Sequence, residues 1–392
     1  MPPLNGIRVL DFSRHNPGRY SSMILADLGA EVITVETPRN SEKPLSFQFT
    51  DDTWYRYLGM NCNKKSIAIN LKTEKGRDLI YRLVDKTDVL IEANRPGVAK
   101  RLGIDYETLS QRNPKLIYCS ISGYGQNSPY ATRGSHDINV VAMVGSLNTV
   151  GTKEGPPIYS THPCISDVTA WCFTLTSIMS ALYAREKTGK GQFIDVSITD
   201  GTLFSNWVMN MRYLQAGEIA ERSITPTGSD IAWLNVYKTS DGKYIALSCQ
   251  EPQSWENLCR LLKCEQFIPH HFTIGEKHRE IYETFSDIFQ TKKREEWMKL
   301  LDEADVAAAP VYTIAETFDD VHFRSAGVIT EVEHPKLGSV KLLKDPLSLS
   351  DTPIEPRMRP PLYAENTTEI LSTIAGISES KLEELKNEGV IE

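Results

Sequence analysis

The sequence predicts an α/β protein with an open, mostly parallel sheet covered by helices and a second, smaller α+β domain. The first observation is a strand–helix–strand pattern that recurs within residues 6–125 and is typical of parallel strands joined by helices. The second is a change of pattern after about residue 220, where a hairpin is followed by amphipathic helices. The 392 residues are enough for two or three domains.

The repeated pattern begins at the N-terminus. Residues 6–13, GIRVLDFS, are a short apolar run typical of a buried strand. Residues 20–30 have helical periodicity and reach Gly29, a favourable helix end, and 31–38 predict the next strand. Because no GxGxxG motif follows the first strand, a dinucleotide site is not indicated. The same pattern predicts strands at 66–71, 88–93 and 115–125 and helices at 74–87, 98–103 and 106–113.

The rest of the chain is less regular. Residues 125–160 are rich in Gly, Ser, Pro and Asn and predict loops around one short helix at 137–147. A long apolar helix follows Asp167, and 188–201 predict a turn, a strand and a helix start. The smaller domain is expected at 225–325, with a hairpin turning at Asp241 and Gly242. The Pro-rich tail, 326–392, is expected to run extended over its own protein or a partner and to end in a polar helix.

Composition excludes several function classes. The net charge of −8 argues against nucleic-acid binding, because no excess of Lys and Arg is present to neutralise phosphates. Seven cysteines, an odd number without a CxxC pair, predict a reducing compartment, which we take to be the cytoplasm. The histidines show no metal-ligand spacing, so no metal site is expected. No secretory signal and no run of about 18 apolar residues is found, so no membrane association is expected.

Asp167 is the most informative single residue. It stands in the stretch HPCISDVTAW, among small and apolar neighbours, just before the long apolar helix. One interpretation is a helix N-cap, since Ser or Asp before an apolar periodic run is a helix start signal. The other is a carboxylate that does chemistry at a helix start. The two interpretations are compatible, because the partial positive charge at a helix start keeps a carboxylate ionised.

Five long phrases resemble one protein family. They are LNGIRVLDFS…ADLGAEVITVETP, NCNKKSIAINLKTEKGRDLI, DVLIEANRPGVAKRLGIDYETL, NPKLIYCSISGYGQ and REKTGKGQFIDVSITDG. Together they resemble the class III CoA-transferases, a family that also contains the α-methylacyl-CoA racemases. The resemblance runs from about residue 4 to 325 and more loosely to the end.

The resemblance implies an architecture that composition does not show. Family members have ring-shaped subunits, each with a large Rossmann-like domain and a small domain, that thread through each other as an interlocked dimer. We therefore expect the first part of the large CoA-binding domain at 1–200, a linker at 201–224, the small domain at 225–325, and a linker with a C-terminal return to the large domain at 326–392. The dimer partner is expected to be a second copy, with a paralogous subunit as the alternative.

The resemblance also implies a role for Asp167. In the transferases an aspartate in this context attacks the thioester of an acyl-CoA, forming a mixed anhydride and then an aspartyl-CoA thioester. Ser166 and Trp171 stand where the family usually has glycine, and their side chains are expected to narrow the site. The substrates implied are an acyl-CoA and an acceptor carboxylic acid, with no permanently bound cofactor.

A second activity remains open. The racemases of this family exchange the α-proton of an acyl-CoA through an enolate, using a histidine, the same aspartate and a glutamate. His136 in SHDIN and Glu251 in EPQSWE match the histidine and the glutamate, although each could instead be a surface or helix-cap residue. The sequence after Asp167 favours the transferases. A silent structural subunit and a non-enzymatic CoA-binding module are further alternatives.

Coenzyme A is expected at the carboxyl edge of the parallel sheet, where ligands of open α/β sheets bind. Arg and Lys side chains at strand ends suit its three phosphates. Asn16 stands where many transferases carry glutamine. The residues that the resemblance assigns to CoA binding are His15, Asn16, Pro17, Arg39, Leu71, Lys72, Asn94, Arg95 and Arg101.

Overall fold

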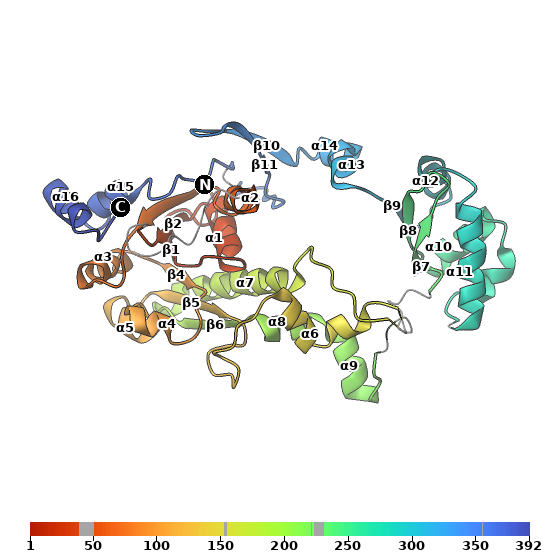
Figure 1. Cartoon of the computed structure of the whole chain (residues 1–392), viewed down its shortest axis with the longest axis horizontal. Helices are drawn as coiled ribbons and strands as arrows, with labels where there is room; N and C mark the ends of the chain where they lie inside the picture. Colours follow the sequence, from red (N-terminus) through yellow and green to blue (C-terminus); the bar gives the residue numbers. More distant parts are fainter. Residues whose placement is uncertain (39–50, 153–154, 221, 223–230, 274, 355) are drawn as a thin grey trace. The chain divides into compact units, whose positions relative to one another are not determined.

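A computed structural model of the chain describes residues 1–38, 51–152, 155–220, 222, 231–273, 275–354 and 356–392. Arg39, one of the predicted CoA-binding residues, lies outside the described residues. The chain divides into two compact units (Figure 1). The first unit contains Met1–Val140, His162–Ser205 and Ala326–Glu392, and the second contains Val141–Thr161 and Asn206–Ser325.

The first unit is built on a six-stranded parallel sheet with the order β3-β2-β1-β4-β5-β6. This is the doubly wound order in which the strand sequence reverses between β1 and β4, so the loops after these strands open a crevice at the carboxyl edge. The prediction of an α/β fold with a parallel sheet is confirmed. The strands are β1 (Arg8–Asp11), β2 (Glu31–Glu36), β3 (Lys64–Ala68), β4 (Val89–Glu92), β5 (Ile117–Ser122) and β6 (Phe193–Ser197).

Apolar side chains fill both faces of the sheet, as expected for parallel strands covered by helices. Leu10 and Leu90 belong to the core on one face, and Val9 and Val89 to the core on the other. The helices of this unit are α1 (Gly18–Asp27), α2 (Asp51–Met60), α3 (Glu74–Val84), α4 (Val98–Leu102), α5 (Tyr106–Arg112), α6 (Asp137–Met143), α7 (Ile165–Thr188), α8 (Ile198–Ser205), α15 (Thr367–Thr373) and α16 (Glu379–Asn387).

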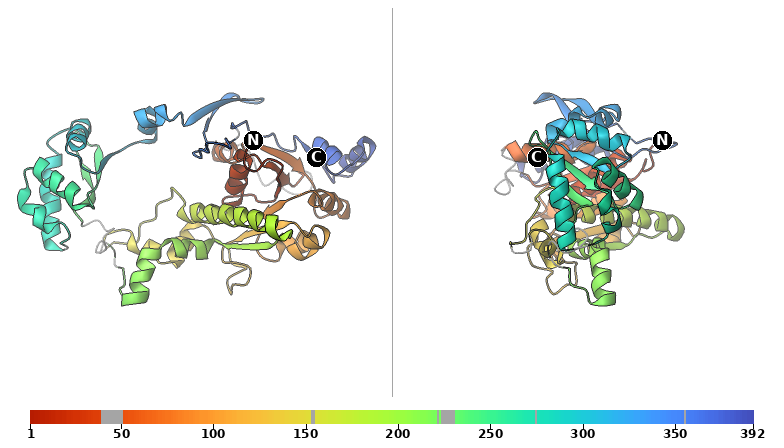
Figure 2. Two further views of the ribbon diagram at one scale, coloured as in Figure 1. Left: turned by 180° about the vertical axis from the view of Figure 1, so that it is seen from behind. Right: turned by 90° about the vertical axis from the view of Figure 1, so that its right-hand side faces the viewer.

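Helix α7 is the longest helix in the described part of the chain. Its 24 residues and mean hydropathy would allow a membrane span by length and composition alone, which the sequence analysis did not anticipate. The buried side chains of Ile178, Ala181 and Leu182 pack on the sheet core together with α1. Figures 1 and 2 show α7 running alongside the sheet. A helix in the core of a domain can have the same length and mean hydropathy.

The C-terminal segment packs against the β3 edge of the first unit. The Asn70 N–H donates to the Val390 carbonyl, and Ile69 and Ile391 form an antiparallel bridge. Residues 326–345 were expected to be extended, but they contain a hairpin, β10 (Ile329–His334) and β11 (Gly338–Leu343). Its alternate apolar residues explain the hairpin, because Val332 and Leu342 pack on Met23 and Cys62.

The second unit contains the predicted α+β elements. Strands β7 (Leu234–Lys238) and β8 (Tyr244–Ser248) pair antiparallel around Gly242, whose φ of 78° suits a hairpin turn. Strand β9 (Ala308–Val311) extends this sheet beside β8, and the sequence analysis had not assigned it. Residues 201–224, predicted as a linker, contain the end of α8 and all of α9. The helices of this unit are η1 (Ser146–Thr149), α9 (Trp207–Ala216), α10 (Pro252–Leu261), η2 (Glu265–His270), α11 (Glu276–Phe289), α12 (Arg294–Glu303), α13 (Ile314–Asp319) and α14 (Val321–Ser325).

Candidate functional site

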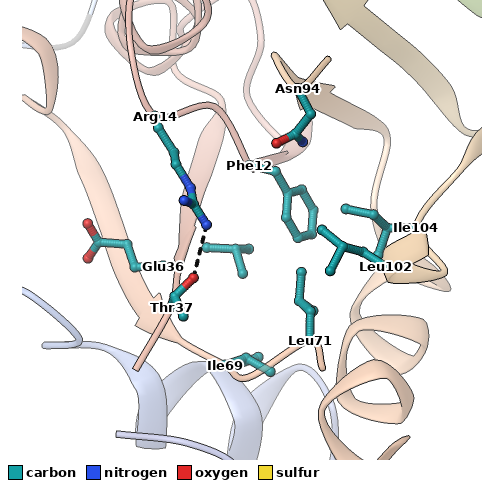
Figure 3. Close-up of a pocket in the computed structure, with 10 residues that line it drawn as sticks. Phe12, Arg14, Glu36, Thr37, Ile69, Leu71, Asn94, Leu102 and Ile104 are labelled. Carbon is teal, nitrogen blue, oxygen red and sulfur yellow. Dashed lines mark hydrogen bonds between the residues drawn. The ribbon is translucent and has the colours of Figure 1, made fainter. Parts of the chain in front are cut away.

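A pocket lies at the carboxyl edge of the sheet, where the loops after β1, β2, β3 and β4 meet. Its empty volume is about 320 Å³, including space open to solvent. Figure 3 shows Arg14 reaching toward Thr37, to which it donates a hydrogen bond of 3.1 Å, with Phe12 and Asn94 across the pocket. The pocket therefore combines apolar walls with polar groups at its mouth. It is lined by Phe12, Arg14, Val35, Glu36, Thr37, Ile69, Leu71, Asn94, Leu102 and Ile104.

A buried ion pair supports the β1–α1 loop beside this pocket. Asp11, the last residue of β1, accepts a hydrogen bond from the Ser13 N–H at 2.9 Å and lies 3.3 Å from Lys64 Nζ. Burial would raise the pKa of Asp11, but Lys64, Arg19 and bonds from Ser13 and Ser22 hold it below its usual value. Burial lowers the pKa of Lys64 to about 8, although Asp11 opposes that effect. The network fixes the backbone that leads into residues 14–17.

A second buried acid supports the loop after β4. Glu92, the last residue of that strand, accepts hydrogen bonds of 2.9 Å from both the N–H and the side-chain amide of Asn94. Its other carboxylate oxygen accepts from the Ser120 hydroxyl, which in turn accepts from Gln126 Nε2 at 2.9 Å. Burial raises the pKa of Glu92, while these donors lower it. One carboxylate therefore joins the pocket residue Asn94 to the glycine-rich loop after β5.

The structure brings part of the predicted CoA set to the pocket. Leu71 and Asn94 line it, and Arg101 precedes the lining residue Leu102. The sequence analysis missed the lining residues Phe12, Arg14 and Thr37, although the first two flank Ser13 after the first predicted strand. The other predicted residues lie on the loops of the same edge. His15, Asn16, Lys72, Arg95 and Arg101 are exposed, and Pro17 is buried as the N-cap of α1.

Asp167 lies in the first turn of α7. The helix begins at Ile165 with Cys164 as its N-cap, so the prediction that Asp167 is the N-cap is wrong by three residues. The carboxylate is half-buried and still lies in the turn where the positive end of the helix dipole favours an anion. Backbone N–H groups in a first turn have no partner within their own helix, so such a turn can stabilise negative charge.

The turn that carries Asp167 is held from two sides. The Ser166 N–H and hydroxyl donate to Asp137 Oδ1 at 2.7 and 2.6 Å. The Thr169 hydroxyl donates to the Ser166 carbonyl at 3.0 Å and lies 3.2 Å from the Thr202 hydroxyl of α8. These contacts connect the first turn of α7 to the start of α6 and to the middle of α8.

The loop after β5 closes the same region. The Thr199 N–H and hydroxyl of α8 both donate to the Gly123 carbonyl, at 3.0 and 2.7 Å. A Cβ at Gly123 would lie 2.0 Å from Ser135 Oγ, so only glycine fits this position without a shift. The loop therefore packs closely against Ser135, and the next residue, His136, lies at the start of α6.

His136 and Asp167 each lie next to one member of a hydrogen-bonded pair, Asp137 and Ser166. His136 is exposed and accepts the Val140 N–H through its carbonyl at 3.2 Å, so it caps α6 with its backbone. Asp137, the next residue, contacts Ser166, the residue before Asp167. Glu251 belongs to the second unit, where it is the exposed N-cap of α10. Within the described part of the chain, no group of three or more His, Cys, Asp and Glu side chains could hold a metal ion.

Comparisons with known proteins identify the family of the chain. The family description CoA-transferase family III matches residues 4–367. The chain belongs to this family. The resemblance identified from the sequence is therefore confirmed, and the family acts on CoA thioesters.

Several relatives of this CoA-transferase family III member carry named activities. A mouse succinyl-CoA:glutarate CoA-transferase is 30% identical over 100% of this chain and 91% of its own length. A human alpha-methylacyl-CoA racemase is 30% identical over 99% and 97%, and a formyl-CoA:oxalate CoA-transferase from Rhodopseudomonas palustris strain BisB18 has the same values. A crystal structure of a CAIB/BAIF family protein from Brucella suis superposes with a TM-score of 0.81 at 28% identity and covers 95% of this chain and 99% of that one.

Proposed function

We propose that the protein is a CoA-transferase that moves CoA between an acyl-CoA thioester and a carboxylic acid. The observation that carries the proposal is the half-buried carboxylate of Asp167 in the first turn of α7, in a chain of this family. A nucleophile needs an accessible oxygen, and a carboxylate nucleophile must stay ionised. A helix start contributes about 0.3–1 kcal/mol toward the ionised form.

The proposed reaction has four steps, all at Asp167. An Asp167 oxygen attacks the thioester carbonyl, the C–S bond breaks, and CoA leaves as a thiolate, which produces a mixed anhydride of Asp167 and the donor acid. The thiolate attacks the Asp167 carbonyl and releases the donor acid, which leaves an aspartyl-CoA thioester. The acceptor carboxylate attacks this thioester, giving a second anhydride and thiolate. The thiolate then attacks the acceptor acyl group and frees Asp167.

Coenzyme A is proposed to bind at the carboxyl edge of the sheet. The pocket there offers apolar walls from Phe12 and Leu71 and amide groups from Asn94, a combination that suits a nucleotide base. The exposed cations Lys72 and Arg101 on the neighbouring loops suit the phosphates.

A short dicarboxylic acid is the acceptor class that we propose first. The mouse relative is named for succinyl-CoA and glutarate, and the bacterial relative for formyl-CoA and oxalate. Both acceptors in those names are dicarboxylic acids. Succinyl-CoA with glutarate is therefore the donor and acceptor pair to assay first.

A racemase is the second candidate. It is favoured by the contact between Asp137 and Ser166, which brings the neighbouring residues His136 and Asp167 to the same corner of the first unit. The human racemase among the relatives adds support. In this alternative His136 and Asp167 exchange the α-proton of a 2-methylacyl-CoA, and Glu251 is the third residue that the family resemblance assigns to the reaction.

We propose that the protein forms an interlocked dimer of ring-shaped subunits. Exposed apolar side chains on α9 support an oligomer, because monomers rarely expose large contiguous apolar patches. A second copy of the chain is the simplest partner, and a paralogous subunit is the alternative. The exposed apolar residues of α9 are Trp207, Val208, Met211, Tyr213 and Leu214.

One experiment separates the two activities. The enzyme is incubated in deuterated water with a 2-methylacyl-CoA and no acceptor acid, and in parallel with succinyl-CoA and glutarate. A transferase forms glutaryl-CoA and takes up no deuterium at the α-carbon, and Asp167→Asn abolishes this exchange because an amide is a poor nucleophile. Rapid α-deuteration without acceptor, reduced about 10²–10⁴-fold by His136→Ala, would instead establish the racemase.

A further inference from the structure

The first turn of α7 carries a hydrogen-bonded pair that the proposed reaction does not itself use. Asp137 Oδ1 accepts both the N–H and the hydroxyl of Ser166, at 2.7 and 2.6 Å. Ser166 is 1% exposed and Asp137 is 9% exposed, so little water competes for these bonds. The N-cap residue Cys164 has no oxygen in its side chain, and Asp137 supplies the carboxylate oxygen that an N-cap Asp or Ser would otherwise provide.

The pair lies between Asp167, the proposed nucleophile, and His136, which has a role only in the racemase alternative. His136 directly precedes Asp137, and Asp167 directly follows Ser166. Neighbouring Cα atoms are about 3.8 Å apart, so any movement of the Asp137–Ser166 contact is passed on to Asp167. A misplacement of about 1 Å can cost about 10²-fold in rate.

The hydroxyl of Ser166 adds a second bond to the same oxygen. A glycine at this position, as the family resemblance leads one to expect, could offer only its N–H. Because two donors of Ser166 bond to one oxygen of Asp137, they fix both the orientation of the turn and its distance from Asp137. Ser166 and Asp137 therefore hold the turn more rigidly than a glycine could.

We infer that Asp137 is a positioning residue for Asp167, acting through Ser166. This inference rests on the proposed function, because it concerns the rate at which Asp167 attacks a thioester. It assigns to Asp137 no contact with substrate and no proton transfer. Its effect falls on the chemical step and not on the binding of CoA, since the nucleotide pocket is formed by other loops.

The test measures acylation of Asp167 directly. Enzyme and succinyl-CoA are mixed in a rapid-quench apparatus, trapped with hydroxylamine, and the Asp167 hydroxamate is measured by mass spectrometry over a range of succinyl-CoA concentrations. Asp137→Ala should slow acylation at saturation about 10-fold or more, with half-saturation changed by less than about 3-fold. Asp137→Asn keeps an acceptor oxygen and should restore the rate to within about 3-fold of wild type.

Asp105→Ala is the matched control. Asp105 accepts the N–H and the hydroxyl of Thr108 at the start of α5, at 3.1 and 3.0 Å, so it receives the same two kinds of donor at another helix, one on each carboxylate oxygen. Because Asp105 follows the pocket residue Ile104, the acylation rate of Asp105→Ala is compared with that of wild type at saturating succinyl-CoA. At saturation the two rates should match, although the melting temperature of Asp105→Ala falls.

The outcomes separate this inference from the proposed function. If wild type forms the hydroxamate and Asp137→Ala forms it equally fast, the inference is wrong and the transferase proposal stands. The inference is also overturned if Asp137→Ala raises the half-saturating concentration of succinyl-CoA as much as it lowers the acylation rate. It is overturned as well if Asp137→Asn does not restore the rate. If wild type forms no hydroxamate, the transferase proposal fails and the inference falls with it. If Asp137→Ala does not fold, Ser166→Ala decides: it removes one of the two bonds, and an unchanged rate contradicts the inference.

Discussion

Replacing Glu92 with glutamine tests how strongly the pocket proposed for the CoA nucleotide depends on the carboxylate that bonds to its lining residue Asn94. Glu92 is 3% exposed, and one of its oxygens accepts two hydrogen bonds of 2.9 Å from Asn94. The backbone N–H of Asn94 can only donate. The Ser120 hydroxyl accepts from Gln126, so its own proton is directed to the other oxygen of Glu92.

A glutamine has one oxygen and one NH2 group, so it cannot accept on both sides. If its oxygen faces Asn94, its NH2 group faces Ser120 and the hydroxyl proton of Ser120 loses its acceptor. If it is turned the other way, two donors meet at Asn94. Either arrangement leaves a buried donor unsatisfied, at a cost of about 1–3 kcal/mol. If Asn94 shifts and this whole cost falls on the pocket, CoA affinity falls by between about 5-fold and about 150-fold.

Titration calorimetry with CoA and thermal unfolding measure the two effects separately. Ser120→Ala is the matched control, because it disturbs the far side of Glu92 while leaving both Asn94 bonds in place. It should lower the melting temperature and keep CoA affinity near that of wild type. The reasoning is refuted if Glu92→Gln binds CoA as tightly as wild type, or if Ser120→Ala weakens CoA binding equally.

Two further predictions concern stability and assembly. Burial raises the pKa of Asp27 to about 7, Arg357 opposes this shift, and the nearby Asp345 adds to it. The folded state therefore holds this proton more tightly than the unfolded chain does, and the stabilisation, complete below about pH 4, is lost as the pH rises through about 7. Asp345→Asn should reduce the fall in melting temperature between pH 5 and pH 8, and identical slopes in variant and wild type would contradict this. Light scattering should give about twice the 44.1 kDa chain mass, and an active monomer would exclude the interlocked dimer.

The parallel sheet could be predicted because each of its strands is a local feature of the sequence. Short apolar runs such as 6–13 and 88–93 have enough Val, Ile and Leu to be recognised without their neighbours. The hairpin of β10 and β11 was missed because it lies at the start of a Pro-rich tail that was interpreted as extended throughout. Its signal was the alternation in ITEVEH and GSVKLL on either side of the turn at Pro335, Lys336 and Leu337.

The candidate site was predictable only in part, because its parts are distant in sequence. Asp167 stands out locally, but its neighbour Ser166 is held by Asp137, 29 residues earlier, and no local pattern reports that contact. The helix boundary was misplaced for a related reason, since Asp137 provides a cap that Asp167 was expected to provide. Arg14 and Thr37 meet in the pocket only because β1 and β2 are neighbours in the sheet.

Buried carboxylates act differently at the carboxyl edge of the sheet and at the start of α7. At the carboxyl edge of the sheet, Asp11 and Glu92 end adjacent strands, and each accepts the N–H of the residue two positions later. Buried carboxylates there shape loops whose backbone would otherwise be free to move. At α7, by contrast, Asp167, the proposed nucleophile, is half-buried, and a different acid, Asp137, takes the capping role. Because Asp137 provides the cap, the proposed attack by Asp167 leaves the cap of α7 intact.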